Sequence, residues 1–286
     1  MKSDKVLETI KTWRLPHIGN IELHRGTSVT RDCPRHWHNE LHLCLIEAGG
    51  GELHYRRAIH HTPSGSLFIV QPAEVHANRT SDETGCTYRN LYVDPDLLLQ
   101  TAKELDQRRS LPLFPQAVLF DHSIVRLYRE VHQTLEVSAC HLEQESLLLR
   151  LLVYLISNYS EKRPFLQRAG RERQAVRCVR DYLTDNYADN VSLARLAQIA
   201  NLSPFHLTRV FCLELGLPPH AYQTQVRVIK AKELLHRGWE ISSVALATGF
   251  ADQSHLTRHF KRLIGVPPGE YRKHSKNIQD RYQSMD

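Results

Sequence analysis

Four histidines in the first third of the chain have the residue type and the spacing of a ligand-binding site. Even-numbered positions hold His36, His38, Glu40 and His42. Side chains alternate between the two faces of a strand, so on a single strand these four would project from one face. His76 follows further along, after an apolar run and a proline turn. Neutral imidazoles are good ligands for Zn, Fe, Ni or Cu, and three or four converging rings would suffice for a divalent transition metal. The same rings would equally line a pocket for an organic effector without metal, or face water.

A second group of informative residues lies in a pattern that the C-terminal third contains twice. His206-Leu207-Thr208-Arg209 returns as His255-Leu256-Thr257-Arg258 after a constant interval of 49 residues, and flanking Phe, Gly, Pro-Pro and Tyr residues return with it. Two copies at this interval indicate a duplicated helical module, because a solenoid needs at least three repeats.

The residues of this module that would face outward suit DNA recognition. Arginine donates two hydrogen bonds to guanine, glutamine reads adenine, and threonine or phenylalanine meets a thymine methyl group. At about 100° per residue, a helical projection predicts that the following residues lie on the outer faces: Phe205, Thr208 and Arg209 in the first copy, and Gln253, Ser254, Thr257, Arg258 and Lys261 in the second. The alternative for any single arginine is a solvated surface charge.

The elements that carry these residues are predicted to be helix-turn-helix units. Each copy has a short helix, 193–200 or 241–248, followed by a turn and a second helix. The second helices begin after Ser203 and Asp252, which are good N-caps, and Pro204 suits the first helical position. His206 and His255 project sideways, so we expect them to contact phosphate or to pack.

The elements around the N-terminal histidines are predicted to be strands. From about residue 18 to residue 93, apolar alternation and glycine or proline turns indicate short strands, which suggest a barrel or a sandwich. A short helix at 97–105 and two amphipathic helices at 123–135 and 143–159 follow. The apolar face of the last helix, from Leu147 to Ile156, is expected to pack partly against the barrel and partly against a second subunit in a coiled-coil-like homodimer.

Composition and charge bound the possibilities for the whole chain. The 286 residues suggest two domains. We assign residues 1–160 to a sensing and dimerisation domain, 161–173 to a charged linker, 174–273 to a DNA-binding domain and 274–286 to a tail. Residues 1–170 hold 20 Lys+Arg against 20 Asp+Glu, whereas residues 171–274 hold 15 against 9. The excess positive charge therefore lies on the duplicated segment, as expected for a domain that meets a polyanion.

Cysteine usage and the lack of long apolar runs indicate the compartment. The six cysteines form no Cys-x-x-Cys pair, which argues against a zinc finger or a thioredoxin-like site and favours free thiols in a reducing compartment. The chain has no apolar run long enough to span a membrane, and its first residues lack a secretory signal. We therefore expect a cytoplasmic protein without membrane contact.

Residues 20–95 resemble the cupin barrel, in the version that senses sugars or small ligands in DNA-binding regulators. The first cupin motif, His-x-His-x-x-x-Glu, corresponds to His36, His38 and His42, with histidine in place of the glutamate. The second motif corresponds to Gly65, Pro72 and His76. The resemblance implies a pocket for a small-molecule or metal effector; the histidine at position 42 does not forbid metal, since nitrogen can replace oxygen as a ligand.

Residues 174–273 resemble the AraC/XylS family of bacterial transcription regulators. The matching residues are Gly249-Phe250-Ala251-Asp252-Gln253-Ser254-His255-Leu256, Phe260-Lys261, Gly265-Val266-Pro267-Pro268 and Tyr271-Arg272. The resemblance implies that a long helix at about 219–237 joins the two modules and that their outer residues read adjacent major-groove segments of double-stranded DNA. It also implies contact with RNA polymerase during activation.

These observations predict an α+β two-domain fold: an N-terminal cupin-like β-barrel with dimerisation helices, then an all-α domain of two helix-turn-helix modules. The expected function is a ligand-responsive DNA-binding transcription regulator, and not an enzyme. Two rivals remain: a metal-dependent cupin enzyme with an appended DNA-binding domain, for which no general base is marked beside the histidines, and an architectural DNA binder without an effector.

Overall fold

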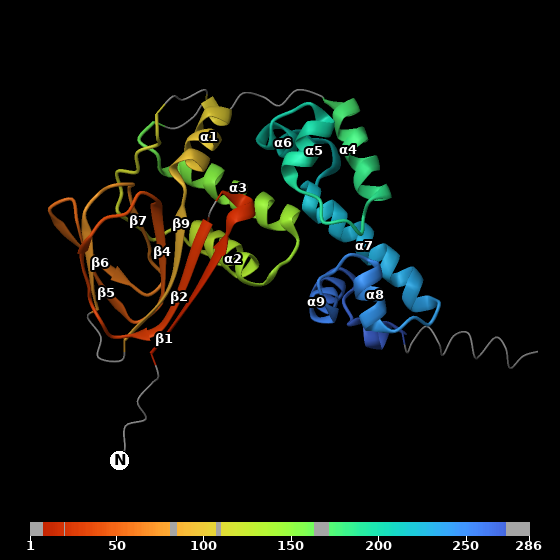
Figure 1. Ribbon diagram of the computed structural model, residues 1–286, viewed down its shortest axis with the longest axis horizontal. Coiled ribbons are helices and arrows are strands. Elements are labelled where there is room, and N and C mark those ends of the chain that lie inside the picture. The colour runs from red at the N-terminus through yellow and green to blue at the C-terminus, as the bar shows by residue number, and fades with distance from the viewer. Residues whose placement is uncertain (1–7, 20, 81–84, 107–109, 163–171, 273–286) are drawn as a thin grey trace, which may run out of the picture. The chain divides into compact units, whose positions relative to one another are not determined.

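The computed structural model describes residues 8–19, 21–80, 85–106, 110–162 and 172–272 (Figure 1). The described residues of Met1–Val137 and Leu147–Gln167 form one compact unit, and those of Ser138–Ser146 and Arg168–Asp286 form a second. Most of the predicted linker at 161–173 and all of the predicted tail at 274–286 lie outside the described residues. We describe each unit by itself.

The first unit is built on two antiparallel sheets. Its strands are β1 (Thr9–Leu15), β2 (Ile21–Val29), β3 (Cys33–His36), β4 (Leu41–Ala48), β5 (Gly50–Tyr55), β6 (Ala58–Pro63), β7 (Leu67–Val70), β8 (His76–Thr80), β9 (Cys86–Val93) and β10 (Val118–Leu119), with a 3-10 turn at Pro16–Ile18. One sheet has the order β1-β2-β9-β4-β7-β10 and the other β3-β8-β5-β6. The sheets enclose apolar side chains from both, including Ile46, Leu53 and Phe68.

Three helices accompany these sheets: α1 (Pro95–Asp106), α2 (His122–Val137) and α3 (His141–Tyr159). Helix α2 covers the outer face of the six-stranded sheet, where the Tyr128 hydroxyl lies 2.9 Å from the Leu43 carbonyl oxygen and 2.8 Å from that of Arg89. Leu41, Leu43 and Leu45 point toward this side, so the other face of β4 directs His42, Cys44 and Ile46 between the sheets.

The α+β two-domain prediction is confirmed, and the strands form two separate sheets within it. One expectation was wrong: His36, His38 and His42 do not share a strand, because β3 ends at His36 and β4 begins at Leu41. Parity alone does not reveal a break between strands. Strands β1 and β10 were not predicted, since β1 is a largely exposed edge strand and β10 has only two residues.

The apolar face of α3 is buried in the single chain. Leu147, Leu148, Leu151, Leu152, Leu155 and Ile156 are each at most 4% exposed. Packing within the protein therefore covers the predicted apolar face except Leu149, which is half-buried. A second subunit would have to use other residues of this helix, such as the partly exposed Leu149 and Val153.

The second unit contains α4 (Arg173–Asp185), α5 (Leu193–Ala200), α6 (Pro204–Leu215), α7 (Pro219–His236), α8 (Ile241–Ala247) and α9 (Gln253–Ile264). Helices α5–α6 and α8–α9 are the two predicted helix-turn-helix modules, and α7 joins them (Figure 1). Both second helices end at a glycine in the left-handed region, Gly216 and Gly265, where a side chain would be strained. Among the described residues, no helix is long and apolar enough to cross a membrane.

The two predicted N-caps form as expected. The Ser203 hydroxyl accepts a hydrogen bond from the His206 amide at 3.2 Å, and the Asp252 carboxylate accepts one from the His255 amide at 2.7 Å. Ser203→Ala and Asp252→Ala should each lower the free energy of unfolding by about 1 kcal/mol, because an amide at the helix start loses its acceptor. Urea denaturation measures this loss. Ser242→Ala, at an exposed position inside α8, is the control, and an equal loss there would contradict the capping role.

Candidate effector site and nucleic-acid interface

Three of the four predicted histidines converge although they come from separate elements. His36 ends β3, His38 lies in the following connection, and His76 begins β8 directly opposite His36 in the strand register. Their ring centroids are 4.2 Å apart for His36 and His76, and 4.9 Å apart for His38 and His76. One ring nitrogen from each of the three lies within 4.8 Å of the others. The three rings therefore have the separations of a ligand set.

Backbone carbonyls orient all three rings in the same way. Each Nδ1 lies 2.9–3.1 Å from a carbonyl oxygen two residues away, namely that of Pro34, Glu40 and Glu74. A carbonyl can only accept, so Nδ1 carries the proton and the neutral ring keeps a bare lone pair on Nε2. Among the described residues, His38 Nε2 and His76 Nε2 are buried without a hydrogen-bond partner. This arrangement leaves lone pairs for a ligand.

Burial favours the neutral form of His38 and His76. It lowers the pKa of His76 to about 4, and it also lowers the pKa of His38; neighbouring histidines act in the same direction on both. A neutral imidazole can coordinate a metal or accept a hydrogen bond from a hydroxyl group, whereas an imidazolium can do neither.

His42 lies beside the three rings but plays a different part. It is 2% exposed, stacks on Tyr92 at a centroid distance of 4.5 Å, and lies 5.3 Å from the His38 ring. Burial lowers its pKa well below the ordinary value. Its nitrogens do not join the group of three; the Asn90 side chain is their polar neighbour, without well-formed hydrogen-bond geometry among the described residues. His42 therefore presents a neutral ring to the space between the sheets.

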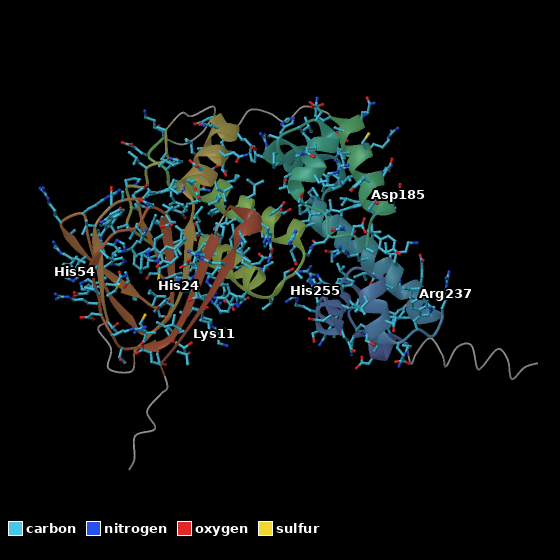
Figure 2. The ribbon with its side chains drawn as sticks, in the orientation of Figure 1. Lys11, His24, His54, Asp185, Arg237 and His255 are labelled. Atoms are coloured by element: carbon cyan, nitrogen blue, oxygen red, sulfur yellow. The ribbon has the colours of Figure 1, made fainter. Side chains whose placement is uncertain are left out.

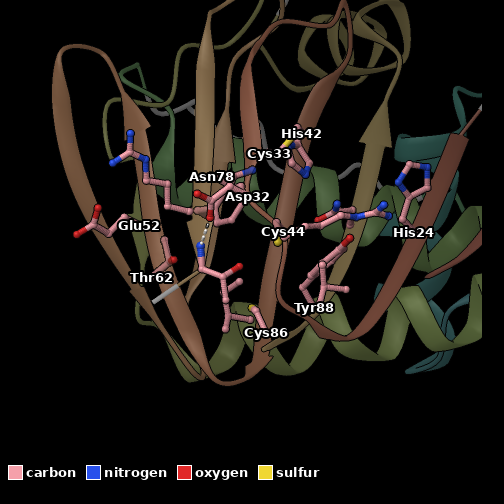
Figure 3. A pocket seen from close by; sticks show the side chains of 18 of the residues that line it. His24, Asp32, Cys33, His42, Cys44, Glu52, Thr62, Asn78, Cys86 and Tyr88 are labelled. Carbon is pink, nitrogen blue, oxygen red and sulfur yellow. Dashed lines mark hydrogen bonds between the residues drawn. The ribbon is translucent and has the colours of Figure 1, made fainter. Parts of the chain in front are cut away.

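That space is a cavity of about 460 Å³ (Figure 3). Its polar lining includes His42, Glu52, Asn78, Arg79, Asn90 and Tyr92. The amide oxygens of Asn78 and Asn90 are buried and unpartnered among the described residues. Both asparagines were missed from the sequence. Tyr88, Asn90 and Tyr92 share parity along β9, which was the available signal, but only the fold shows that this face points inward.

In the second helix-turn-helix module, the predicted outer residues are accessible. Gln253, Ser254, Arg258 and Lys261 are exposed on α9. Thr257 is half-buried, and its hydroxyl donates to the Gln253 carbonyl oxygen at 2.8 Å. His255 faces the opposite way and is buried, so it packs and cannot meet phosphate (Figure 2 labels its position).

The first module differs at one residue. Phe205 was predicted to face outward, but it is only 7% exposed. The Arg209 guanidinium lies over its ring, 5.3 Å from the centroid, so the aromatic ring packs beneath the arginine. The helical projection assigned Phe205 to the outer face from its angle around the helix axis, which takes no account of a side chain stacked on the ring. Thr208 and Arg209 remain partly exposed, and the Thr208 hydroxyl donates to the Pro204 carbonyl oxygen.

Comparison with known proteins agrees with this architecture. Residues 18–152 match the AraC-like ligand binding domain, and residues 196–274 match a helix-turn-helix domain. The HTH-type transcriptional regulator YbfI of Bacillus subtilis is 33% identical over 241 residues, which cover 84% of this chain and 87% of that protein. The chain belongs to the AraC family of transcriptional regulators. As a member of this family, it is a ligand-responsive DNA-binding regulator and not an enzyme.

The chain is also similar to other regulators. The transcriptional activator RhaS of Enterobacter is 25% identical over 84% of this chain and 87% of its own length. The C-terminal domain of AraT, a response regulator from Geobacillus stearothermophilus, is 30% identical over 38% of this chain and 88% of that one, with a TM-score of 0.34.

Proposed function

We propose that α6 and α9 read two successive major-groove segments of one DNA site. The proposal is supported by the exposed polar residues of α9 and by the equivalent positions of Arg209 and Arg258 in the two modules. Thr208 and Arg209 would read one segment, with Phe205 holding the arginine from beneath. Gln253, Ser254, Thr257 and Arg258 would read the next, about 34 Å away, and Lys261 would contact phosphate. Because the two reading surfaces differ, one protomer recognises an asymmetric site.

We further propose that the cavity between the sheets binds the effector, and that the effector is a small hydroxyl-rich compound. Neutral imidazole nitrogens and unpartnered amide oxygens accept hydrogen bonds, and Glu52 and Arg79 add one charge of each sign. A related protein, 22% identical over 81% of this chain, is the lactose operon transcription activator of Staphylococcus xylosus. This relationship favours a sugar among hydroxyl-rich compounds.

A divalent transition metal is the second candidate, and one observation favours it. The unpartnered Nε2 atoms of His38 and His76, with the His36 ring beside them, fit the donor set that such an ion requires, and backbone carbonyls orient all three rings. These three residues would hold the ion, which would supply a Lewis acid to a bound hydroxyl group.

In this proposal, effector binding shifts the protein toward an arrangement that activates transcription, since a ligand changes an equilibrium only by its differential affinity for two states. Activation would involve contact with RNA polymerase. A homodimer would place two such DNA-binding domains on the promoter. Because its DNA target lies there, the protein would work in the cytoplasm. Residues 1–160 would sense, and residues 174–273 would bind DNA.

A thermal-shift screen of sugars, aromatic compounds and metal salts tests the effector site. At 100 times its Kd, a ligand stabilises the folded protein by about 2.7 kcal/mol, which raises the Tm by about 5–10 °C. His36→Ala combined with His42→Ala should abolish the shift because two rings that line the cavity are lost, while operator affinity without effector stays the same. His61→Ala, at an exposed position on β6, is the control. A full shift in the double variant would refute this site.

A further inference from the structure

A second cluster of ligating side chains lies within the DNA-binding unit. His255 and His259 are one turn apart on α9 and therefore share a face. Glu143, in the first turn of α3, belongs to the same compact unit and faces both rings. All three side chains are buried, and one ligand atom from each lies within 4.8 Å of the other two. This cluster is separate from the histidines of the sheets.

The duplication shows that His259 is unexpected at its position. At the interval of 49 residues, Val210 of the first module corresponds to His259 of the second, and Val210 is fully buried in the core. An imidazole in an apolar core is costly unless it is partnered. His259 is 2% exposed, and its Nε2 has no hydrogen-bond partner among the described residues. The replacement of valine by histidine therefore calls for an interaction that the first module does not need.

The distances match a shared ion better than direct hydrogen bonds. Glu143 Oε1 lies 3.7 Å from His259 Nε2, and Glu143 Oε2 lies 3.8 Å from His255 Nε2. Both distances exceed the usual range of about 2.7–3.2 Å for such bonds. Nitrogen and oxygen ligands lie about 2.0–2.2 Å from a zinc ion. Two ligand atoms of the same ion are therefore roughly 3.4–3.7 Å from each other, depending on the bond angle. One ligand atom from each residue, all within 4.8 Å of one another, would move inward to bind one ion.

The charge states also suit a cation. Burial lowers the pKa of His259 to about 3 and lowers that of His255 as well, so both rings are neutral. Burial alone would raise the pKa of Glu143, but the Ser138 hydroxyl, which donates to Oε2 at 2.7 Å, favours the ionised carboxylate, and the pKa is lowered overall. The cluster therefore combines one carboxylate with two neutral imidazoles, a donor set typical of transition metals.

One rearrangement accompanies binding. Arg262 donates to His259 Nδ1 at 3.0 Å, and the Ala251 amide donates to His255 Nδ1 at 3.4 Å. An Nδ1 that accepts a hydrogen bond leaves the proton on Nε2. On binding through Nε2, this proton moves to Nδ1, so that no proton is lost. The exposed Arg262 side chain then turns to solvent, and the long Ala251 contact is given up.

We propose that Glu143, His255 and His259 bind one divalent transition metal ion, with zinc as the probe and a water molecule completing the coordination. The ion joins the start of α3 to α9, whose opposite face carries Gln253 and Arg258. Since α3 continues into the first unit, metal occupancy strengthens the attachment of that chain segment to the proposed reading helix. This inference does not depend on the identity of the effector.

Metal titration of the full-length chain tests the site. The His38→Ala/His76→Ala variant is the background, because it removes the histidine cluster of the sheets. Co²⁺ should bind this background with one equivalent per chain and give the visible absorption of a low-coordinate site, and zinc should displace it. Glu143→Gln and His259→Val should each weaken binding on the order of 100-fold or more, since a three-ligand site loses a ligand.

Two variants separate metal binding from folding. His259→Val copies the residue of the first module, so it should fold at least as stably without metal as the background does, yet show no zinc-induced rise in Tm. His206→Gln, the counterpart of His255 in the first module, should leave the Kd for zinc unchanged. The proposal is overturned if the background binds no metal at micromolar concentration, or if His259→Val binds one equivalent with the same Kd.

Discussion

Arg258→Ala should remove protection from one half of the DNA footprint, and Arg209→Ala should remove it from the other half. Each arginine is carried by a separate module, on α9 or α6, at equivalent positions of the repeat. The loss of a two-hydrogen-bond contact to guanine costs about 1–3 kcal/mol, which corresponds to a fall in affinity of roughly 5- to 150-fold. Footprinting at fixed salt, together with Kd measurements on operators mutated in either half, checks this result.

A phosphate contact gives a different signature and serves as the comparison. Lys261→Ala should weaken binding to all sequences alike and reduce the salt dependence by about one counterion, because a lysine on phosphate reads no base. Arg237→Ala, at the exposed end of α7, should change neither property. If Arg258→Ala or Arg209→Ala behaved like Lys261→Ala, these arginines would only neutralise phosphate, and the proposed reading surfaces would be wrong.

Arg89→Met should destabilise the sensing unit more than any other single substitution considered above. The Arg89 side chain is 5% exposed and pairs with two carboxylates: its Nε lies 3.1 Å from Glu47 Oε2, and its guanidinium also contacts Glu136. Its loss leaves both carboxylates buried without this partner, which costs about 3–5 kcal/mol. We expect the Tm to fall by about 10 °C in differential scanning calorimetry. Replacing both glutamates by glutamine in the same chain should recover part of this loss.

The pH dependence of stability should change sign with this substitution. In the native protein, burial raises the pKa values of Glu47 and Glu136, whereas Arg89 and other basic neighbours lower them. The second effect is larger, so both pKa values are below the ordinary glutamate value. The ion pairs therefore stabilise the fold above the ordinary glutamate pKa, and this stability is lost as the pH falls through the lowered values. Without Arg89, the buried carboxylates favour their protonated form, so mild acid should stabilise the variant. Parallel acid destabilisation of both proteins would contradict the role of Arg89.

Much of the helical domain was predictable because its signals are local. The N-cap of α6 is Ser203 and that of α9 is Asp252, and the bounds of α5 and the start of α6 agree with the prediction. A cap and the first turn that it serves are only a few residues apart, so the sequence contains both partners of the interaction. The exposed residues of α9 followed from helical periodicity for the same reason.

The N-terminal site was predictable in its residues but not in its geometry. His36, His38 and His76 were identified by type and spacing, but His36 and His38 were expected to share one strand with His42. They converge because β3 pairs with β8, which places His36 opposite His76. These two strands are about 40 residues apart in the chain. The alternation of residues within one strand does not show which distant strand pairs with it.

The amino-acid sequence by itself determined the duplicated module, its helix caps, the outer face of its second reading helix and the family of the protein. Each of these depends on interactions between near neighbours in the chain or on a repeated pattern. The tertiary structure decided which faces are covered. It buries Phe205 beneath Arg209, takes up the leucine face of α3 within one chain, and brings Glu143 to His255 and His259. These outcomes depend on close packing between segments far apart in the chain, which helical or strand periodicity cannot specify.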